Sequence, residues 1–194
     1  TITIPSTTKS NWLKLNPDQT GFYRVNYTQS GWARLQIAIE QKVISPTDRL
    51  GLQNDAYALS RAGYLPVTQF LDLAKSYVNE SEYPVWSDLS LNINNLYNLI
   101  SDQPYHDDFT AYARNIFILA GRNVGWRSRP GERDQDALLR STLLTNLGYY
   151  NDQTTLNEAL LHFNEFVEEP GTIHPDIRDV VLTLAAKQGD ETTF

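Results

Sequence analysis

The sequence contains no cysteine and no methionine, and it has only three histidines. Without cysteine the chain can form no disulfide, no thiolate nucleophile and none of the usual cysteine-based zinc sites. Without methionine it has no initiator residue, so we expect a processed product or a segment of a longer protein. No run of apolar residues approaches the ~18 that a membrane-spanning helix requires. Residues 1–10 also lack the basic and apolar regions of a signal peptide.

Positive charge is scarce as well. The 194 residues include 16 basic and 23 acidic side chains, which gives a formal net charge of −7. An acidic chain of this kind argues against nucleic acid or an anionic membrane as the main partner. The length is that of one large domain, or of one domain with a piece of another. The absence of cysteine favours a cytoplasmic compartment.

The first 28 residues differ from the rest of the chain. Residues 11–15 alternate in polarity, and residues 21–27 are rich in aromatic and β-branched types. Turn-forming residues lie between the two segments. This pattern predicts a hairpin, to which residues 1–4 could add a third strand. Because two or three strands do not make an independent core, these strands resemble the end of a sheet whose other strands are missing.

From Ser30 onward the pattern is helical. Ser45-Pro46-Thr47-Asp48 is a helix-start signal, and His174-Pro175 begins the last predicted helix. Glycines at 63, 121 and 189 are predicted helix ends. Apolar residues at spacings of three and four predict eight helices; their ranges are 30–42, 46–61, 67–79, 85–100, 107–121, 132–147, 152–168 and 175–188.

Short connections between helices of this length predict antiparallel neighbours. The sequence therefore predicts a mainly α fold, a superhelical array of α-α hairpins of the HEAT or armadillo type, preceded by the two or three strands. Since residues 187–194 read as a helix end and a few linking residues, we expect the array to continue beyond Phe194. We expect the isolated chain to self-associate, because its strand edge and one apolar helix face would lack partners.

No pattern of a metal or nucleophilic site is visible in the sequence. His106, His162 and His174 are far apart, and His162 with Glu165 forms an i, i+3 pair that is better interpreted as a surface polar pair. Acidic residues at 134 and 136 suit the start of a helix. There is no G-x-S-x-G and no phosphate-binding glycine loop, so we predict no catalytic, cofactor-binding or metal-binding residue.

One group of basic residues stands out in the longest loop between predicted helices. It consists of four arginines within twelve positions, beside Trp126; they are Arg122, Arg127, Arg129 and Arg133. Arginine forks suit carboxylates, so these residues are candidates for contact with a peptide carboxylate or with a neighbouring domain. The simpler interpretation is a solvated loop in which the arginines pair with Glu132, Asp134 and Asp136.

The most distinctive stretch is Asn11-Trp-Leu-Lys-Leu-Asn-Pro-Asp-Gln-Thr-Gly-Phe-Tyr-Arg-Val-Asn-Tyr27. It closely resembles the segment that joins the β-sandwich to the C-terminal helical domain in zinc aminopeptidases of the puromycin-sensitive and aminopeptidase N family. Further stretches of similarity follow in the family's order at 45–63, 138–152 and 173–181. The resemblance implies that residues 1–28 are terminal strands of a truncated β-sandwich and that residues 29–194 are the helical domain.

The resemblance implies a function for the parent protein and a different one for this segment. Members of the family are hydrolases that remove N-terminal residues from peptides with one zinc ion, held by H-E-x-x-H and a downstream glutamate. In the family a G-x-M-E-N segment binds the free amine of the substrate. Neither this segment nor H-E-x-x-H occurs here, so the chain by itself should bind no zinc and cleave nothing. Its implied role is to cover the active site and help enclose and select peptide substrates, in contact with the catalytic and sandwich domains of the same polypeptide. Two alternatives remain, an independent helical-repeat scaffold for a protein partner and a hydrolase whose site is assembled from scattered residues.

Overall fold

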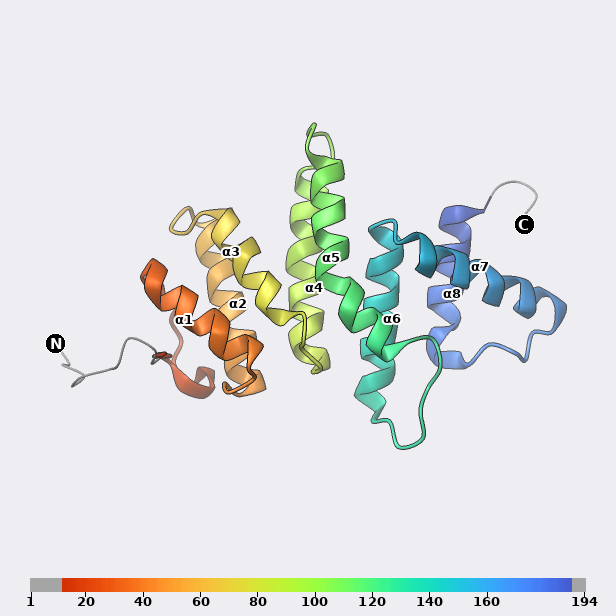
Figure 1. Ribbon diagram of the computed structural model, residues 1–194, viewed down its shortest axis with the longest axis horizontal. Helices are drawn as coiled ribbons and strands as arrows, with labels where there is room; N and C mark the ends of the chain where they lie inside the picture. Colours follow the sequence, from red (N-terminus) through yellow and green to blue (C-terminus); the bar gives the residue numbers. More distant parts are fainter. Residues whose placement is uncertain (1–11, 190–194) are drawn as a thin grey trace. The chain divides into compact units, whose positions relative to one another are not determined.

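The computed structural model describes residues 12–189, and in this range the protein is helical, with eight α-helices and no strand. The mainly α prediction is thereby confirmed. Two short 3-10 helices, η1 (Pro17–Gln19) and η2 (Lys75–Tyr77), complete the regular structure (Figure 1). The α-helices are α1 (Gln29–Glu40), α2 (Pro46–Arg61), α3 (Val67–Ala74), α4 (Tyr83–Leu99), α5 (His106–Val124), α6 (Asp134–Tyr149), α7 (Gln153–Glu168) and α8 (Pro175–Gln188).

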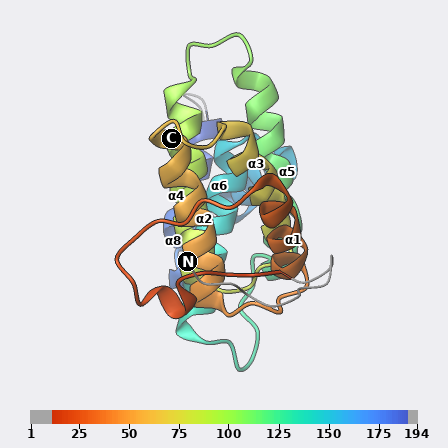
Figure 2. The ribbon, with the colours of Figure 1, turned by 90° about the vertical axis from the view of Figure 1, so that its left-hand side faces the viewer.

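The chain divides into two compact units, Thr1–Glu80 and Ser81–Phe194. In the first unit α2 packs against α3 and η1, while α1 packs against η2 (Figure 2). In the second unit α5 packs against α6, and α8 packs against both α6 and α7. Four pairs of helices joined by short connections are in contact, as the loop lengths predict; they are α2 with α3, α4 with α5, α6 with α7, and α7 with α8. The superhelical array remains a prediction.

Local capping explains why two helix starts could be predicted to the residue. The Ser45 hydroxyl accepts a hydrogen bond from the Asp48 N–H at 3.2 Å, and His174 Nδ1 accepts from the Asp176 N–H at 3.3 Å. In both helices proline follows the cap as the first helical residue. Proline has no N–H to lose there, and its fixed φ angle suits the first turn. α2 and α8 begin and end where the sequence predicts.

The hairpin predicted from 11–15 and 21–27 is wrong within the described residues. Residues 12–28 form no strand, and η1 occupies the turn between the two segments. A two-stranded hairpin is only marginally stable without further strands, so local alternation did not suffice to specify one. The third strand, predicted at 1–4, lies outside the described residues.

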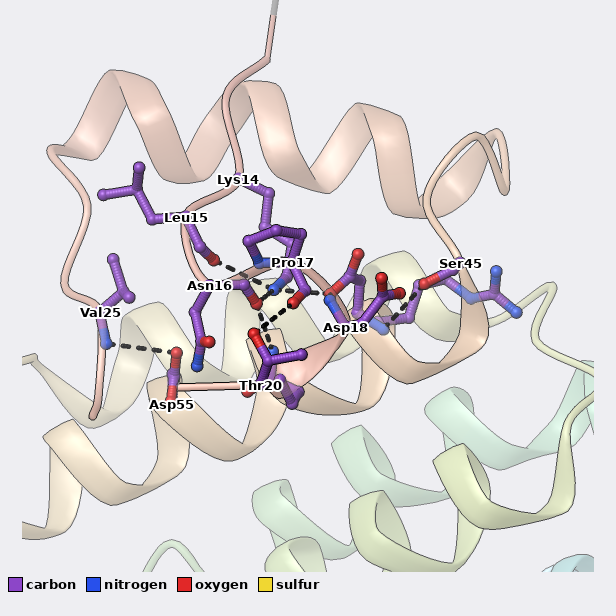
Figure 3. A network of polar contacts seen from close by, with 12 residues as sticks. Lys14, Leu15, Asn16, Pro17, Asp18, Thr20, Val25, Ser45 and Asp55 are labelled. Carbon is purple, nitrogen blue, oxygen red and sulfur yellow. Dashed lines mark hydrogen bonds and ion pairs between the residues drawn. The ribbon is translucent and has the colours of Figure 1, made fainter. Parts of the chain in front are cut away.

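The segment 12–28 is held by side chains of α2 instead of by a neighbouring strand. The Val25 N–H donates to Asp55 Oδ2 at 3.2 Å, and the Asp18 N–H donates to Asp48 Oδ1 at 2.8 Å (Figure 3). Lys14 Nζ lies 2.7 Å from the same Asp48 oxygen. The Val25 N–H is buried and must find an acceptor, whereas the hydrogen bond of the Asp18 N–H is exposed. The two carboxylates accept hydrogen bonds from the backbone as a partner strand would have done.

The end predicted for the fifth helix at Gly121 is also wrong. α5 continues to Val124 and ends before Gly125, whose φ is +62°. Gly121 is buried inside the helix, where a Cβ atom would clash with Leu147 Cδ1 of α6. This glycine therefore permits the close approach of α5 and α6. In a single sequence, a packing glycine and a terminating glycine look alike.

Candidate functional site

A hollow of about 520 Å³ lies in the second unit, beside the loop between α5 and α6. The loop, the first turn of α6 and the start of α8 form its wall. Both signs of charge occur around it, and the ionisable residues are Arg129, Glu132, Arg133, Asp134, His174 and Asp176. The hollow thus contains two of the four arginines that the sequence singles out.

Arg133 is the most constrained of these arginines. Its Nη2 lies 2.8 Å from Asp136 Oδ1, and its Nη1 lies 3.5 Å from Glu82 Oε2. The Asp136 carboxylate also accepts the Arg133 N–H at 2.9 Å, which satisfies a free donor at the start of α6. Hydrogen bonds from Arg133 hold the pKa of the Asp136 carboxyl below its usual value. The predicted pairing of an arginine with Asp136 is therefore confirmed.

The other three arginines differ in position. Arg129 Nη2 donates to the Asn123 carbonyl at 2.7 Å, which holds its guanidinium close to the last turn of α5. Arg122 lies in that last turn and Arg127 in the loop, both exposed and neither in the wall of the hollow. The structure thus brings Arg129 and Arg133 together at one hollow and leaves Arg122 and Arg127 outside it.

Near the hollow, Arg140 is a buried charged residue that the sequence analysis missed. Its side chain on α6 is only 1% exposed, and its Nη2 donates to both carboxylate oxygens of Glu132 at 2.6 Å. Its Nε donates to the Gly125 carbonyl at 3.2 Å. Arg140 thereby ties together the two ends of the loop between α5 and α6. The signal was present, because Arg140 falls among the apolar positions of its helix, between Leu139 and Leu143.

Trp126 holds the same loop against the rest of the unit. Its half-buried ring packs on two buried clusters formed by α6, α7, α8 and the residue Ile173. It also lies 5.2 Å from the ring of His162, centroid to centroid. Trp126 holds the start of the loop by an apolar contact and Arg140 joins its two ends, so the loop is a defined structure that fixes where Arg129 and Arg133 lie.

Each of the three histidines has a local role. His162 Nδ1 lies 3.2 Å from Glu165 Oε2, as the polar-pair interpretation predicts, and His174 caps α8. The ring of His106 lies 4.5 Å from that of Tyr97. Between residues 12 and 189 no three histidine or carboxylate side chains gather in a way that could hold a metal ion. Over the same range, none of the helices combines the length and apolar character needed to cross a membrane.

A buried polar chain joins α4 to α6 in the second unit. The Tyr150 hydroxyl, just after α6, donates to Asn94 Oδ1 at 2.5 Å, and Asn94 Nδ2 donates to Asn146 Oδ1 at 2.8 Å. Asn146 in turn donates to the Thr142 carbonyl. Tyr150 is fully buried, and this burial raises the pKa of its hydroxyl far above the usual value.

Tyr150 should make the second unit sensitive to alkali. Because the pKa of the Tyr150 hydroxyl is raised in the folded state, its contribution to the free energy of unfolding is complete below pH ~10. Above pH ~10 this contribution falls by about 1.4 kcal/mol per pH unit. We expect Tyr150→Phe to lose about 1 kcal/mol at pH 8 and to lack this slope. Urea unfolding at pH 8, 10 and 11 measures both effects. If the free energies of unfolding of the wild type and of Tyr150→Phe differ by the same amount from pH 8 to pH 11, the raised pKa of Tyr150 is contradicted.

The described residues thus form a helical domain whose buried and half-buried charges hold loops and helices in place. Residues 12–194 match the family of ERAP1-like C-terminal domains, and the chain belongs to this family. The resemblance seen in residues 11–27 is confirmed.

Similar proteins are aminopeptidases of several organisms. The chain is 38% identical over 172 residues to aminopeptidase M1-A of Oryza sativa subsp. japonica, an alignment that covers 86% of this chain and 20% of that protein. It is 31% identical over 197 residues to puromycin-sensitive aminopeptidase of Caenorhabditis elegans, covering 100% of this chain and 21% of that protein. For aminopeptidase 2 of Candida albicans the identity is 29% with the same coverage. The chain spans about a fifth of the length of these curated relatives.

Proposed function

We propose that this chain is the C-terminal helical domain of a zinc aminopeptidase, and that it covers the active site and helps enclose and select peptide substrates. The observation that carries the proposal is the family match over residues 12–194, together with the aminopeptidase names of the relatives. These relatives are about five times as long as the chain, which leaves room for a separate catalytic domain.

The described residues do not fit a zinc site. Zinc needs three or four converging ligands, whereas His162 pairs with Glu165, His174 caps a helix and His106 packs on Tyr97. In the proposed enzyme the zinc ion would therefore be held by another part of the polypeptide. The contribution of this chain would be to bind and orient the peptide.

Exposed apolar side chains near the start of the described range support contact with other domains of the same polypeptide. Five such side chains occur within twelve residues; they are Trp12, Leu13, Leu15, Phe22 and Tyr23. Groups of this kind commonly mark an interaction surface. We propose that the catalytic and sandwich domains cover it, with the boundary to the helical domain near residue 28.

The proposal is tested by comparing the full-length polypeptide with the 194-residue chain. We expect the full-length protein to bind about one zinc ion and to release the N-terminal residue of a leucyl peptide. The isolated chain should do neither. Zinc content by mass spectrometry and peptide hydrolysis by chromatography measure the two properties. A full-length protein without zinc and without aminopeptidase activity would sink the proposal and favour an independent scaffold.

The hollow beside Arg129 provides a test of peptide selection. If Arg129 binds the carboxylate of the substrate, Arg129→Ala should raise KM for a peptide about tenfold, because a charge-assisted hydrogen bond is lost. KM for an aminoacyl p-nitroanilide, which has no distant carboxylate, should stay unchanged. Arg122→Ala, an exposed arginine outside the hollow, is the matched control. Equal effects on both substrates would contradict carboxylate binding.

A further inference from the structure

A second hollow, of about 540 Å³, lies in the first unit between α1 and the stretch formed by α3 and η2. From α1 it is lined by Gln29, Ala33, Gln36 and Glu40. These positions are separated by four, three and four residues, so they form one stripe along the helix. The opposite wall includes Gln69 and Asp72 of α3. The hollow is therefore an open groove that runs along α1.

The groove contains polar groups that the fold does not use. Within the described part of the chain, the carboxamides of Gln29, Gln36 and Gln69 make no hydrogen bond. Each carboxamide has an NH₂ donor and a carbonyl acceptor. It can therefore pair with both the C=O and the N–H of a peptide main chain. Groups with this double capacity, repeated along a groove, suit an extended backbone more than they suit a compact polar ligand.

The spacing of the stripe matches an extended peptide. At about 1.5 Å per residue, Gln29 and Gln36 lie about 10.5 Å apart along the axis of α1. Three residues of an extended chain cover about 10 Å. The whole stripe from Gln29 to Glu40 spans about 16 Å, the length of about five extended residues. The small side chain of Ala33 in the middle leaves space for a main chain.

The floor and one end of the groove add selectivity. Trp32, 2% exposed, lies at the floor, and its Nε1 already donates to Asn26 Oδ1, so the indole offers only apolar surface. Asp72 pairs with Lys75 at 2.7 Å, whereas Glu40 has no ionic partner within the described residues. The charge left over in the groove is therefore the carboxylate of Glu40, at the C-terminal end of α1.

We propose that this groove binds an extended stretch of about five residues of a peptide substrate, with a lysine or arginine of the peptide placed against Glu40. The source of the peptide rests on the proposed function, whereas its binding to the groove does not. Gln29, Gln36 and Gln69 hold its main chain, and Glu40 selects the basic side chain. The stretch lies away from the N-terminal residue that is removed, because the sequence lacks the G-x-M-E-N segment of the zinc aminopeptidases that it resembles.

Binding is measured on the full-length protein by fluorescence anisotropy. The probes are amidated Ala-Ala-Ala-Ala-Lys and Lys-Ala-Ala-Ala-Ala, with fluorescein on the N-terminal amine, and the same peptides with glutamate in place of lysine. Since the labelled amine is blocked, the probes report on the groove and not on cleavage. The lysine probe that binds more tightly shows the direction in which the peptide lies in the groove. Gln36→Ala should weaken binding of this probe about fivefold. Glu40→Lys should weaken it about tenfold and should improve binding of the matching glutamate probe.

Two variants in the second unit are the matched controls. Gln135→Ala removes an exposed carboxamide from α6, and Glu158→Lys reverses an exposed charge on α7. Neither should change binding of any probe. Unaltered binding by Gln36→Ala and Glu40→Lys, or equal losses in the controls, would overturn the groove as a peptide site.

A kinetic comparison tests the source of the peptide. With the full-length enzyme, a substrate that carries lysine several residues after its N-terminus should have a lower KM than its glutamate analogue, and Glu40→Lys should reverse the order. Probe binding without this KM difference would overturn the substrate as the occupant and assign the groove to a segment of another protein. The proposed aminopeptidase function fails only if the enzyme cleaves neither substrate, so the two failures are distinguishable.

Discussion

Replacing Glu80 by glutamine should lower the free energy of unfolding of the first unit by about 3–5 kcal/mol. Glu80 and Arg49 are both buried, and two hydrogen bonds join the guanidinium to the two carboxylate oxygens. Arg49 also donates to the Ile44 carbonyl, and its own carbonyl accepts the Tyr77 hydroxyl at 2.7 Å. The pair thus fastens α2 to the end of the unit, and Glu80→Gln would leave the arginine charge buried without its counter-charge.

Urea unfolding followed by circular dichroism measures this loss. Asp72→Asn is the control, because its pair with Lys75 is more than half exposed on both sides and should contribute less than about 1 kcal/mol. The double variant Arg49→Met, Glu80→Leu should recover most of the stability, since a buried ion pair is often replaced by apolar residues at little cost. If Glu80→Gln loses no more stability than Asp72→Asn, the Arg49–Glu80 ion pair is not a main source of stability of the first unit.

Sequence reasoning succeeded where structure depends on neighbours in the chain. The helix starts at Ser45 and His174 follow from caps that act within three residues, and the end of α2 follows from Gly63, whose φ is +77°. Periodicity also located all eight helices, because the buried face of each repeats every three to four residues. The mainly α fold was therefore predictable from the sequence.

Sequence reasoning failed where residues far apart in the chain determine the local structure. Alternation in residues 11–27 favours strands, but the donors of that segment are satisfied by Asp48 and Asp55, some 30 positions away. Gly121 looks like a helix end, yet it faces Leu147 of the next helix. Single-sequence patterns carry no record of such partners.

Only part of the candidate site could be predicted from the sequence, again because residues far apart in the chain determine its geometry. Four arginines within twelve positions could be counted, but the directions of the side chains in the loop depend on the path of the loop. That path depends on Arg140, which forms its ion pair with Glu132 across eight positions, and on Trp126, which packs on helices later in the chain. The residues that position the loop are therefore not the residues that make it conspicuous in the sequence.

Replacing Arg140 should release this loop as well as destabilise the second unit. Arg140→Met keeps much of the apolar volume but loses both hydrogen bonds to Glu132 and the one to Gly125, which should cost about 3 kcal/mol. Arg140→Lys should recover little of this, because an ammonium group cannot reproduce the planar fork that serves the carboxylate and the carbonyl together. Arg178→Met, which alters an exposed arginine of α8, should leave stability nearly unchanged.

Limited trypsin digestion separates loosening of the loop from global unfolding. The peptide bond after Arg127 lies in the exposed part of the loop, whereas the bond after Arg129 precedes a proline. In Arg140→Met the cleavage after Arg127 should accelerate under conditions in which most molecules remain folded, since the loop opens locally. Unchanged cleavage together with lost stability would mean that Trp126 alone holds the loop. Accelerated cleavage, and a KM for peptides raised as in Arg129→Ala, would show that Arg140 positions the hollow without lining it.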